Sequence, residues 1–135
     1  MTFDELMAAN KKAATRKRPS SEEHHIQVAC VRWFSLQYPQ YRGRLFAVPN
    51  GGRRDATTAA KLKAEGVVPG VADLILLKSN RQFGALLIEM KTEKGRQRES
   101  QKKWQEIITS DGEYKYVVCH SFDEFKKEIE EYLNE

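Results

Sequence analysis

The feature that most constrains the fold is a pair of apolar segments in the middle of the chain. Residues 73–77 (DLILL) and 85–91 (ALLIEMK) each have the length and composition of a β-strand, and KSNRQFG joins them. A short polar connection between two such segments predicts a β-hairpin. Because both segments are strongly apolar, the hairpin is expected to be largely buried.

The remaining segments alternate between helical and strand patterns. The basic run of residues 11–18 is expected to end at Pro19. A helix is then expected to begin at Ser20 or Ser21, with Glu22 and Glu23 in its first turn, and to end before Pro39. Further helices are expected at 56–65 and 99–109 and after the capping box at 121–124, and further strands at 44–48 and 115–119, the last one buried. The order α, β, α, β, β, α, β, α predicts an α/β fold.

Length and composition fit one globular domain. The chain has 135 residues, of which 40% are hydrophobic and 10% aromatic, and this excludes wholesale disorder. No apolar run is long enough for a membrane span, and residues 1–20 lack the apolar region of a secretory signal. Cys30 and Cys119 form neither a disulfide framework nor a CxxC metal signature. We expect a soluble cytoplasmic domain at 21–135, after a basic tail at 1–20.

The charges are divided unevenly along the chain. Residues 1–105 hold 20 basic and 10 acidic side chains, whereas residues 106–135 hold 3 basic and 9 acidic ones. A basic body with an acidic C-terminal segment favours a surface that binds a polyanion such as nucleic acid. The alternative is that Lys and Arg only solvate helices. The tail at 1–20 can be a helix that docks on a partner or an arm that touches phosphates.

Three charged residues of the hairpin segments are candidates for a metal-binding site. Glu89 and Lys91 are two apart in a strand, so their side chains share a face, and Asp73 begins the preceding strand. If the strands pair, the two carboxylates converge on one point, where their charge is costly unless a cation offsets it. Mg²⁺ or Mn²⁺ prefers such oxygen ligands, and Lys91 could hold a water. The alternative is a surface ion pair and an exposed aspartate.

Five elements in this order resemble one nuclease family. They are the helical acid and glutamine of EHHIQ (23–27), the loop Asn50-Gly51-Gly52, the segments GVVPGVADL (66–74) and IEMK (88–91), and Gly95 followed by Gln101. Together they resemble the VRR-NUC (virus-type replication-repair nuclease) family of the PD-(D/E)XK superfamily, over about residues 21–134. One departure is Ala72, where the family usually has proline. Proline would stiffen the backbone at the start of the strand but supplies no metal ligand, so this difference affects the backbone and leaves the ligand set unchanged.

The resemblance implies a restriction-endonuclease-like core, with a mixed four-stranded sheet flanked by helices. It has an antiparallel meander of three strands and a right-handed helical crossover to the fourth, with the active site on one sheet edge. The implied metal ligands for Mg²⁺ or Mn²⁺ are Asp73, Glu89, the carbonyl of Met90 and, directly or through water, Glu23. Lys91 partners the attacking water, and Gln101 orients a phosphate or Lys91. The alternative for Glu23 is an acid in the first turn of a helix, and the alternative for Gln101 is an exposed glutamine.

The implied activity is metal-dependent hydrolysis of DNA by single-module proteins of phages and bacteria, which are often homodimers and in some members act on branched DNA. No small-molecule cofactor or membrane is expected. Phe3, Leu6 and Met7 are candidates for part of a dimer interface. The expected DNA contacts are the loop and the basic residues around the site: Asn50, Gly51, Gly52, Arg53, Arg54, Lys61, Lys63, Lys94, Arg96, Arg98, Lys102 and Lys103.

Two other classes compete with a nuclease. A nuclease-like fold could hold DNA or dock on a replication partner without cutting, but intact Asp73, Glu89 and Lys91 argue against this. A transcriptional regulator lacks a helix-turn-helix pattern here. The histidines and cysteines have no zinc spacing, and both cysteines, with Trp33 and Trp104, are expected in the core.

Overall fold

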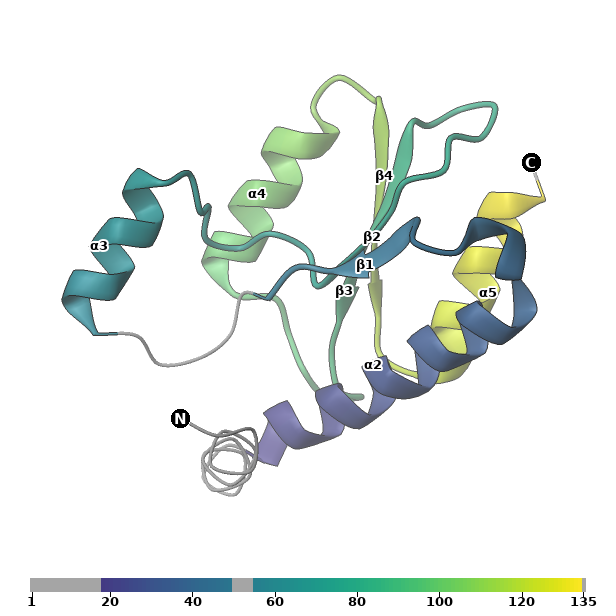
Figure 1. Cartoon of the computed structure of the whole chain (residues 1–135), viewed down its shortest axis with the longest axis horizontal. Coiled ribbons are helices and arrows are strands. Elements are labelled where there is room, and N and C mark those ends of the chain that lie inside the picture. The colour runs from purple at the N-terminus through teal and green to yellow at the C-terminus, as the bar shows by residue number, and fades with distance from the viewer. Residues whose placement is uncertain (1–17, 50–54, 135) are drawn as a thin grey trace.

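The computed structural model describes residues 18–49 and 55–134 (Figure 1). One 3-10 helix, η1, covers Pro39–Tyr41. The α-helices are α2 (Arg18–Gln37), α3 (Ala56–Ala64), α4 (Glu99–Thr109) and α5 (Phe122–Leu133). The strands are β1 (Leu45–Ala47), β2 (Leu74–Leu76), β3 (Ala85–Met90) and β4 (Tyr114–Cys119). This order confirms the predicted α/β fold.

The strands form one mixed sheet in the order β1-β2-β3-β4. The β1–β2 and β2–β3 pairs are antiparallel, whereas β3 and β4 are parallel and are connected through α4. Pairing continues beyond β1, because Val48 N–H donates to Asp73 O at 2.9 Å and Leu77 N–H to Arg44 O at 2.8 Å. The predicted hairpin, meander and parallel fourth strand are therefore confirmed.

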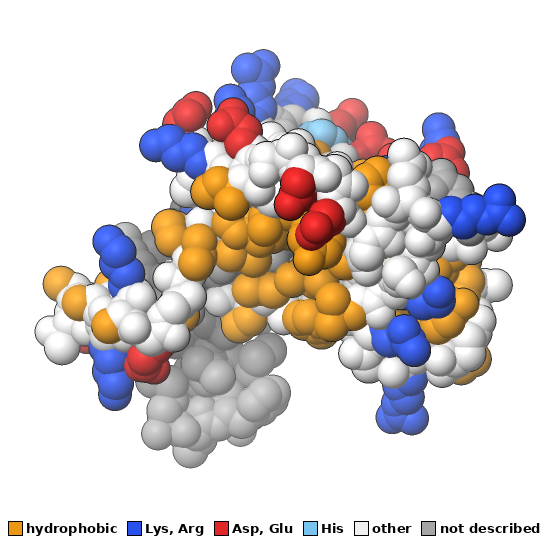
Figure 2. All heavy atoms as spheres, turned by 90° about the horizontal axis from the view of Figure 1, so that it is seen from above, with side chains coloured by type: hydrophobic (Ala, Val, Ile, Leu, Met, Phe, Trp, Pro, Cys, Tyr) orange, Lys and Arg blue, Asp and Glu red, His pale blue; other side chains and the backbone are white. Residues whose placement is uncertain are grey.

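The sheet has two unlike faces because strand residues alternate in direction. One face carries Ile75, Leu87 and Glu89, and α4 packs on its β4 side. Figure 2 shows hydrophobic side chains gathered in the middle of the surface seen from above, with Lys and Arg near its rim. The large hydrophobic side chains that stay exposed on the molecule are Val28, Leu36, Phe46, Val67, Val68, Leu77, Ile107 and Tyr114.

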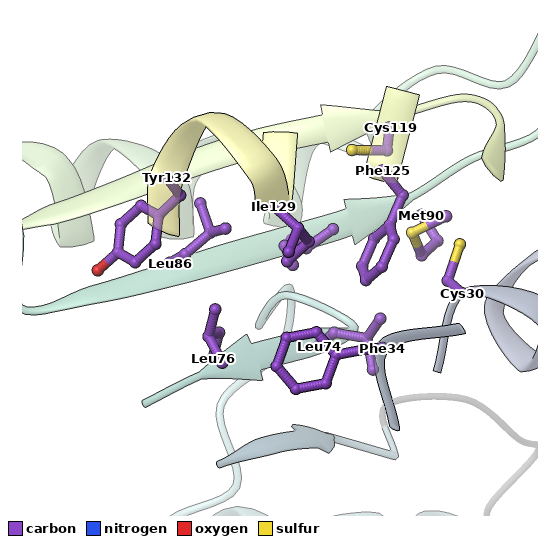
Figure 3. Packing of buried hydrophobic residues seen from close by; sticks show 11 residues of the cluster. Cys30, Phe34, Leu74, Leu76, Leu86, Met90, Cys119, Phe125, Ile129 and Tyr132 are labelled. Atoms are coloured by element: carbon purple, nitrogen blue, oxygen red, sulfur yellow. The ribbon is translucent and has the colours of Figure 1, made fainter. Parts of the chain in front are cut away.

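The other face of the sheet builds the hydrophobic core against α2 and α5 (Figure 3). Leu74 and Ile88, which are paired across β2 and β3, pack there with Phe34 of α2 and Phe125 of α5. Cys30 and Cys119 are both fully buried in this cluster, as predicted. Trp33 is half-buried against the core, and Trp104 is half-buried beside Tyr116 on the other face.

Three sequence predictions need correction. Helix α2 begins at Arg18, before Ser20, because proline is tolerated in the first turn of a helix and Pro19 does not end the segment. Glu22 and Glu23 therefore lie beyond the first turn, which holds no acid. Strand β4 is mostly half-buried, with only its last residue fully buried, because helices cover it incompletely.

No helix among the described residues is both long and apolar enough to cross a membrane.

Candidate active site

The β2–β3 hairpin brings the two predicted carboxylates together. Its register pairs Leu74 with Ile88, so Asp73 and Glu89 face each other one residue further on. Asp73 Oδ2 accepts the Met90 backbone N–H at 2.7 Å, which places this carboxylate against the end of β3. Glu89 is fully buried and Asp73 is half-buried. β3 is an interior strand, so the pair lies at a strand end within the sheet, and the predicted position on a sheet edge is corrected.

Both oxygens of Glu89 are held by side chains. Gln101 Nε2 donates a hydrogen bond to Oε1, and the hydroxyl of Tyr116 donates to Oε2 at 2.7 Å. The ammonium of Lys91 lies 3.8 Å from Oε1 and is itself buried. Because Glu89 and Lys91 are buried, the alternative of a surface ion pair is wrong.

Gln101 ties this carboxylate to the start of α4. Its Oε1 accepts the Arg98 backbone N–H at 2.7 Å, while its Nε2 donates to Glu89. Its side chain is 3% exposed, so the alternative of an exposed glutamine is wrong. The predicted partner also changes: Gln101 orients Glu89, where the sequence suggested a phosphate or Lys91.

The acids of the site share an environment that resists negative charge. Burial and then the nearby Asp73 raise the pKa of Glu89 to about 7, although the Tyr116 hydrogen bond and the cations of Lys91 and Arg98 oppose the rise. Burial also raises the pKa of Asp73, which the Met90 N–H, Lys91 and Arg98 oppose. Acids with shifted pKa values cluster at functional sites, so Asp73 and Glu89 are candidate active-site residues.

A groove of about 750 Å³ runs beside Asp73. Glu23 and Gln27 of α2 line it, so the two residues predicted to share a helix face do reach the site region. Burial raises the pKa of Glu23, and Lys91, Asp73 and Arg98 act on it electrostatically. Glu23 therefore lies within the field of the site, as the resemblance implies.

The donor chemistry of the site fits a hard divalent cation. Asp73 and Glu89 supply carboxylate oxygens, the donor type that Mg²⁺ and Mn²⁺ prefer, and a cation would offset the charge that burial opposes. Among the described residues, no three or more His, Cys, Asp or Glu side chains form a cluster that could hold a metal. A role of Glu23 as a further ligand, directly or through water, stays a prediction.

The loop after Lys91 passes close to this lysine. A Cβ on Gly95 would lie 3.0 Å from Thr92 Oγ1 and 3.3 Å from Lys91 Cβ. Only glycine leaves room for this approach without displacing the neighbours. This close contact gives a physical reason for the glycine that the resemblance singled out.

The predicted DNA-contacting residues are placed unevenly. The loop and arginines at 50–54, like the residues Phe3, Leu6 and Met7 of the tail, lie outside the described residues. Lys94, Arg96 and Arg98 are exposed on the stretch that follows the site, and Lys102 is exposed 3.7 Å from Glu99 Oε1. Lys61, Lys63 and Lys103 are also exposed, the first two on α3, which has no buried residue and extends away from the sheet in Figure 1.

Sequence reasoning missed Tyr116. Its strand was interpreted only as core, yet its hydroxyl reaches Glu89 and Gln97 Nε2 lies 3.4 Å from that hydroxyl. The available signal was weak: a tyrosine in an apolar strand usually needs a partner for its hydroxyl when buried. Nothing in the sequence names that partner.

The chain is an α/β domain in which the half-buried Asp73 and the fully buried Glu89 meet beside the buried Lys91. The chain belongs to the VRR-NUC domain family, whose model matches residues 21–123. A solved structure described as a VRR_NUC domain protein has a TM-score of 0.70 and 25% sequence identity, and the match covers 83% of this chain and 88% of that one. Among curated proteins, none matches the chain.

Proposed function

We propose that the domain is a metal-dependent nuclease that hydrolyses DNA phosphodiester bonds. The observation that carries the proposal is the pairing of Asp73 with Glu89 beside the ammonium of Lys91, where burial opposes the charge of both acids. Membership of the VRR-NUC domain family supports the same reaction class.

The site residues have distinct proposed roles. Asp73, Glu89 and the backbone carbonyl of Met90 hold Mg²⁺ or Mn²⁺, which when bound supplies polarisation of a phosphoryl oxygen and a lowered water pKa. The buried ammonium of Lys91 offsets charge on the phosphate and holds the attacking water. Glu23, on the wall of the groove, is the further acid of the site and acts on the cation directly or through water.

The basic side chains around the site are the proposed DNA contacts. The charge of Arg98 opposes the rise in the pKa of Asp73 and of Glu89, so this arginine acts electrostatically on both acids. Lys94 and Arg96 are exposed just before it in the chain. Residues 50–54 belong to the same proposed set. Because bound phosphates release counterions, DNA affinity should fall as salt rises, with a log–log slope of about −0.9 per contact.

The finer proposal is a structure-selective endonuclease on branched or junction DNA in phage or bacterial replication, recombination or repair. Its support is the family match, because some members of the family that the chain resembles act on branched DNA. A panel of labelled duplex, flap, splayed-arm and four-way-junction substrates tests this selectivity. Equal cleavage of all four would contradict it.

Supercoiled plasmid separates the nuclease from its main alternative. A non-cleaving DNA-binding or replication-partner module would bind DNA with the same salt dependence and would leave the plasmid intact. The nuclease is expected to nick or linearise the plasmid with Mg²⁺ or Mn²⁺ and to stop when EDTA removes the cation. An intact plasmid in both metals would favour the binding module.

A homodimer is the proposed working form. The described residues of one domain form one such carboxylate pair, whereas cutting both strands of a duplex or junction in one encounter requires two. Two-fold symmetry is also the commonest oligomer symmetry. The exposed hydrophobic side chains gathered in Figure 2 are compatible with an interface. Sedimentation equilibrium should give twice the 15.6 kDa of one chain, and loss of residues 1–18 should weaken the dimer. A 15.6 kDa species alone and with junction DNA would reject it.

A further inference from the structure

Tyr116 contacts Glu89 but has no part in the chemistry proposed above. The two oxygens of this carboxylate are held from two different elements, Oε2 by the hydroxyl of Tyr116 on β4 and Oε1 by Gln101 on α4. In the parallel register Tyr116 is opposite Leu87 and Glu89 is opposite Val118, so the tyrosine reaches the carboxylate diagonally across the strand pair.

Gln97, itself held by Gln105, and the indole of Trp104 fix the Tyr116 side chain. Gln97 Nε2 lies 3.4 Å from the Tyr116 hydroxyl and 2.9 Å from Gln105 Oε1, so the two N–H groups of its amide point to these two oxygens. Since Gln97 donates to the tyrosine, the hydroxyl hydrogen is directed to Glu89. The Tyr116 ring also contacts Trp104, with centroids 6.1 Å apart, which restricts its rotation.

We propose that Tyr116 is a positioning residue that fixes the Glu89 carboxylate for cation binding, an inference that rests on the proposed nuclease function. An ionised carboxylate has about four lone-pair sites, and Gln101 and Tyr116 take one on each oxygen. The remaining sites are left for a cation. Partners of ligating groups act through orientation, and their loss typically costs about 10–100-fold in metal affinity or activity.

Tyr116→Phe tests this role because it removes the hydroxyl and keeps the ring that packs on Trp104. Titration calorimetry with Mn²⁺ alone, in the absence of DNA, should give a dissociation constant raised about 10–100-fold. The kcat for plasmid cleavage should fall by a similar factor, whereas KM and DNA affinity in EDTA should change less than about twofold. A merely structural role would not separate kcat and metal affinity from DNA binding.

Tyr114→Phe is the matched control. Tyr114 is on the same strand, opposite Ala85, whereas Glu89 is opposite Val118. Tyr114 and Val118 are four residues apart, a distance of about 13 Å along β4 at the usual rise per residue. Its Mn²⁺ affinity and kcat should equal those of the wild type. Gln97→Ala keeps the tyrosine intact and should weaken Mn²⁺ binding less than Tyr116→Phe does; in the Tyr116→Phe background it should add nothing, because both act through one hydroxyl.

The outcomes separate this inference from the proposed function. If the wild type binds Mn²⁺ and cleaves DNA while Tyr116→Phe keeps the same affinity and kcat, the positioning role is overturned and the nuclease assignment stands. If the wild type neither binds Mn²⁺ nor cleaves DNA, the proposed function fails and this inference fails with it. If Tyr116→Phe does not fold, Gln97→Ala decides: unchanged Mn²⁺ affinity in that variant overturns the role.

Discussion

Asp73→Asn and Glu89→Gln are each expected to abolish DNA cleavage and to leave DNA binding intact or tighter. Each substitution keeps the size of the side chain and removes one charge from the proposed cation site, where the two acids meet across the β2–β3 hairpin. Loss of a ligand charge should cost more than the roughly 100-fold that an outer partner costs, so plasmid cleavage should fall below detection. Binding measured in EDTA should not weaken, because less negative charge faces the phosphate. Cleavage at the wild-type rate in Mg²⁺ by either variant would refute the site assignment.

The stability of Glu89→Gln supplies the control for unfolding. Burial and Asp73 raise the Glu89 pKa from its ordinary value of 4.5 to about 7. A pKa raised by folding means that the folded state favours the proton, so this contribution to stability is complete below pH 4.5 and is lost as the pH rises to about 7. Gln carries no such loss. In EDTA, the Tm of the variant relative to that of the wild type should therefore rise between pH 4.5 and pH 8.

This pH dependence belongs to a group faced by charges and donors from several elements. Asp73 directly precedes β2 and Lys91 directly follows β3. Arg98 caps the start of α4, Gln101 lies in its first turn, and Tyr116 is in β4. Asp73 adds to the rise in the Glu89 pKa, and Lys91, Arg98 and the Tyr116 hydrogen bond oppose it. A Tm difference that does not change with pH would show that Glu89 keeps an ordinary pKa in the folded protein.

The carboxylate pair could be predicted because its signal is local. Two apolar strands joined by a short connection fix a hairpin, and the period of two then places Asp73 opposite Glu89 and on the same face as Lys91. The bounds of α4 were also predicted correctly at 99–109. The relative placement of Asp73, Glu89 and Lys91 follows from the hairpin, so it could be predicted from the sequence.

The residues that hold the pair could not be predicted, because they depend on long-range packing. Tyr116 reaches Glu89 only in the parallel register of β3 and β4, which α4 and its loops set. Gln101 was singled out by resemblance alone, and its partner became clear only from the docking of α4 on the sheet. The start of α2 was misplaced for a different reason: proline was taken as an end signal, although it is also common in first turns.

Gly70→Ala is expected to destabilise the protein by about 2–5 kcal/mol. Gly70 has φ +83°, a conformation that costs other residues about 1–2 kcal/mol. A Cβ there would lie 2.2 Å from the backbone oxygen of Ser100 and 2.9 Å from the Gln101 nitrogen, and such overpacking costs about 1–3 kcal/mol more. Backbone atoms at the start of α4 cannot rotate away as a flexible side chain would. Chemical denaturation measures the loss in unfolding free energy.

Gly43→Ala separates strain from steric contact in this prediction. Gly43 has φ +85°, nearly that of Gly70, but a Cβ there would meet no atom within 4 Å. The control should therefore cost only the conformational part, about 1–2 kcal/mol, and should keep full cleavage activity. Gly70→Ala should in addition lose cleavage at temperatures where it is still folded, because pushing Ser100 and Gln101 outward removes a donor from Glu89. Equal losses of stability in the two variants, with full activity in both, would mean that the turn before Asp73 does not pack on α4 as described.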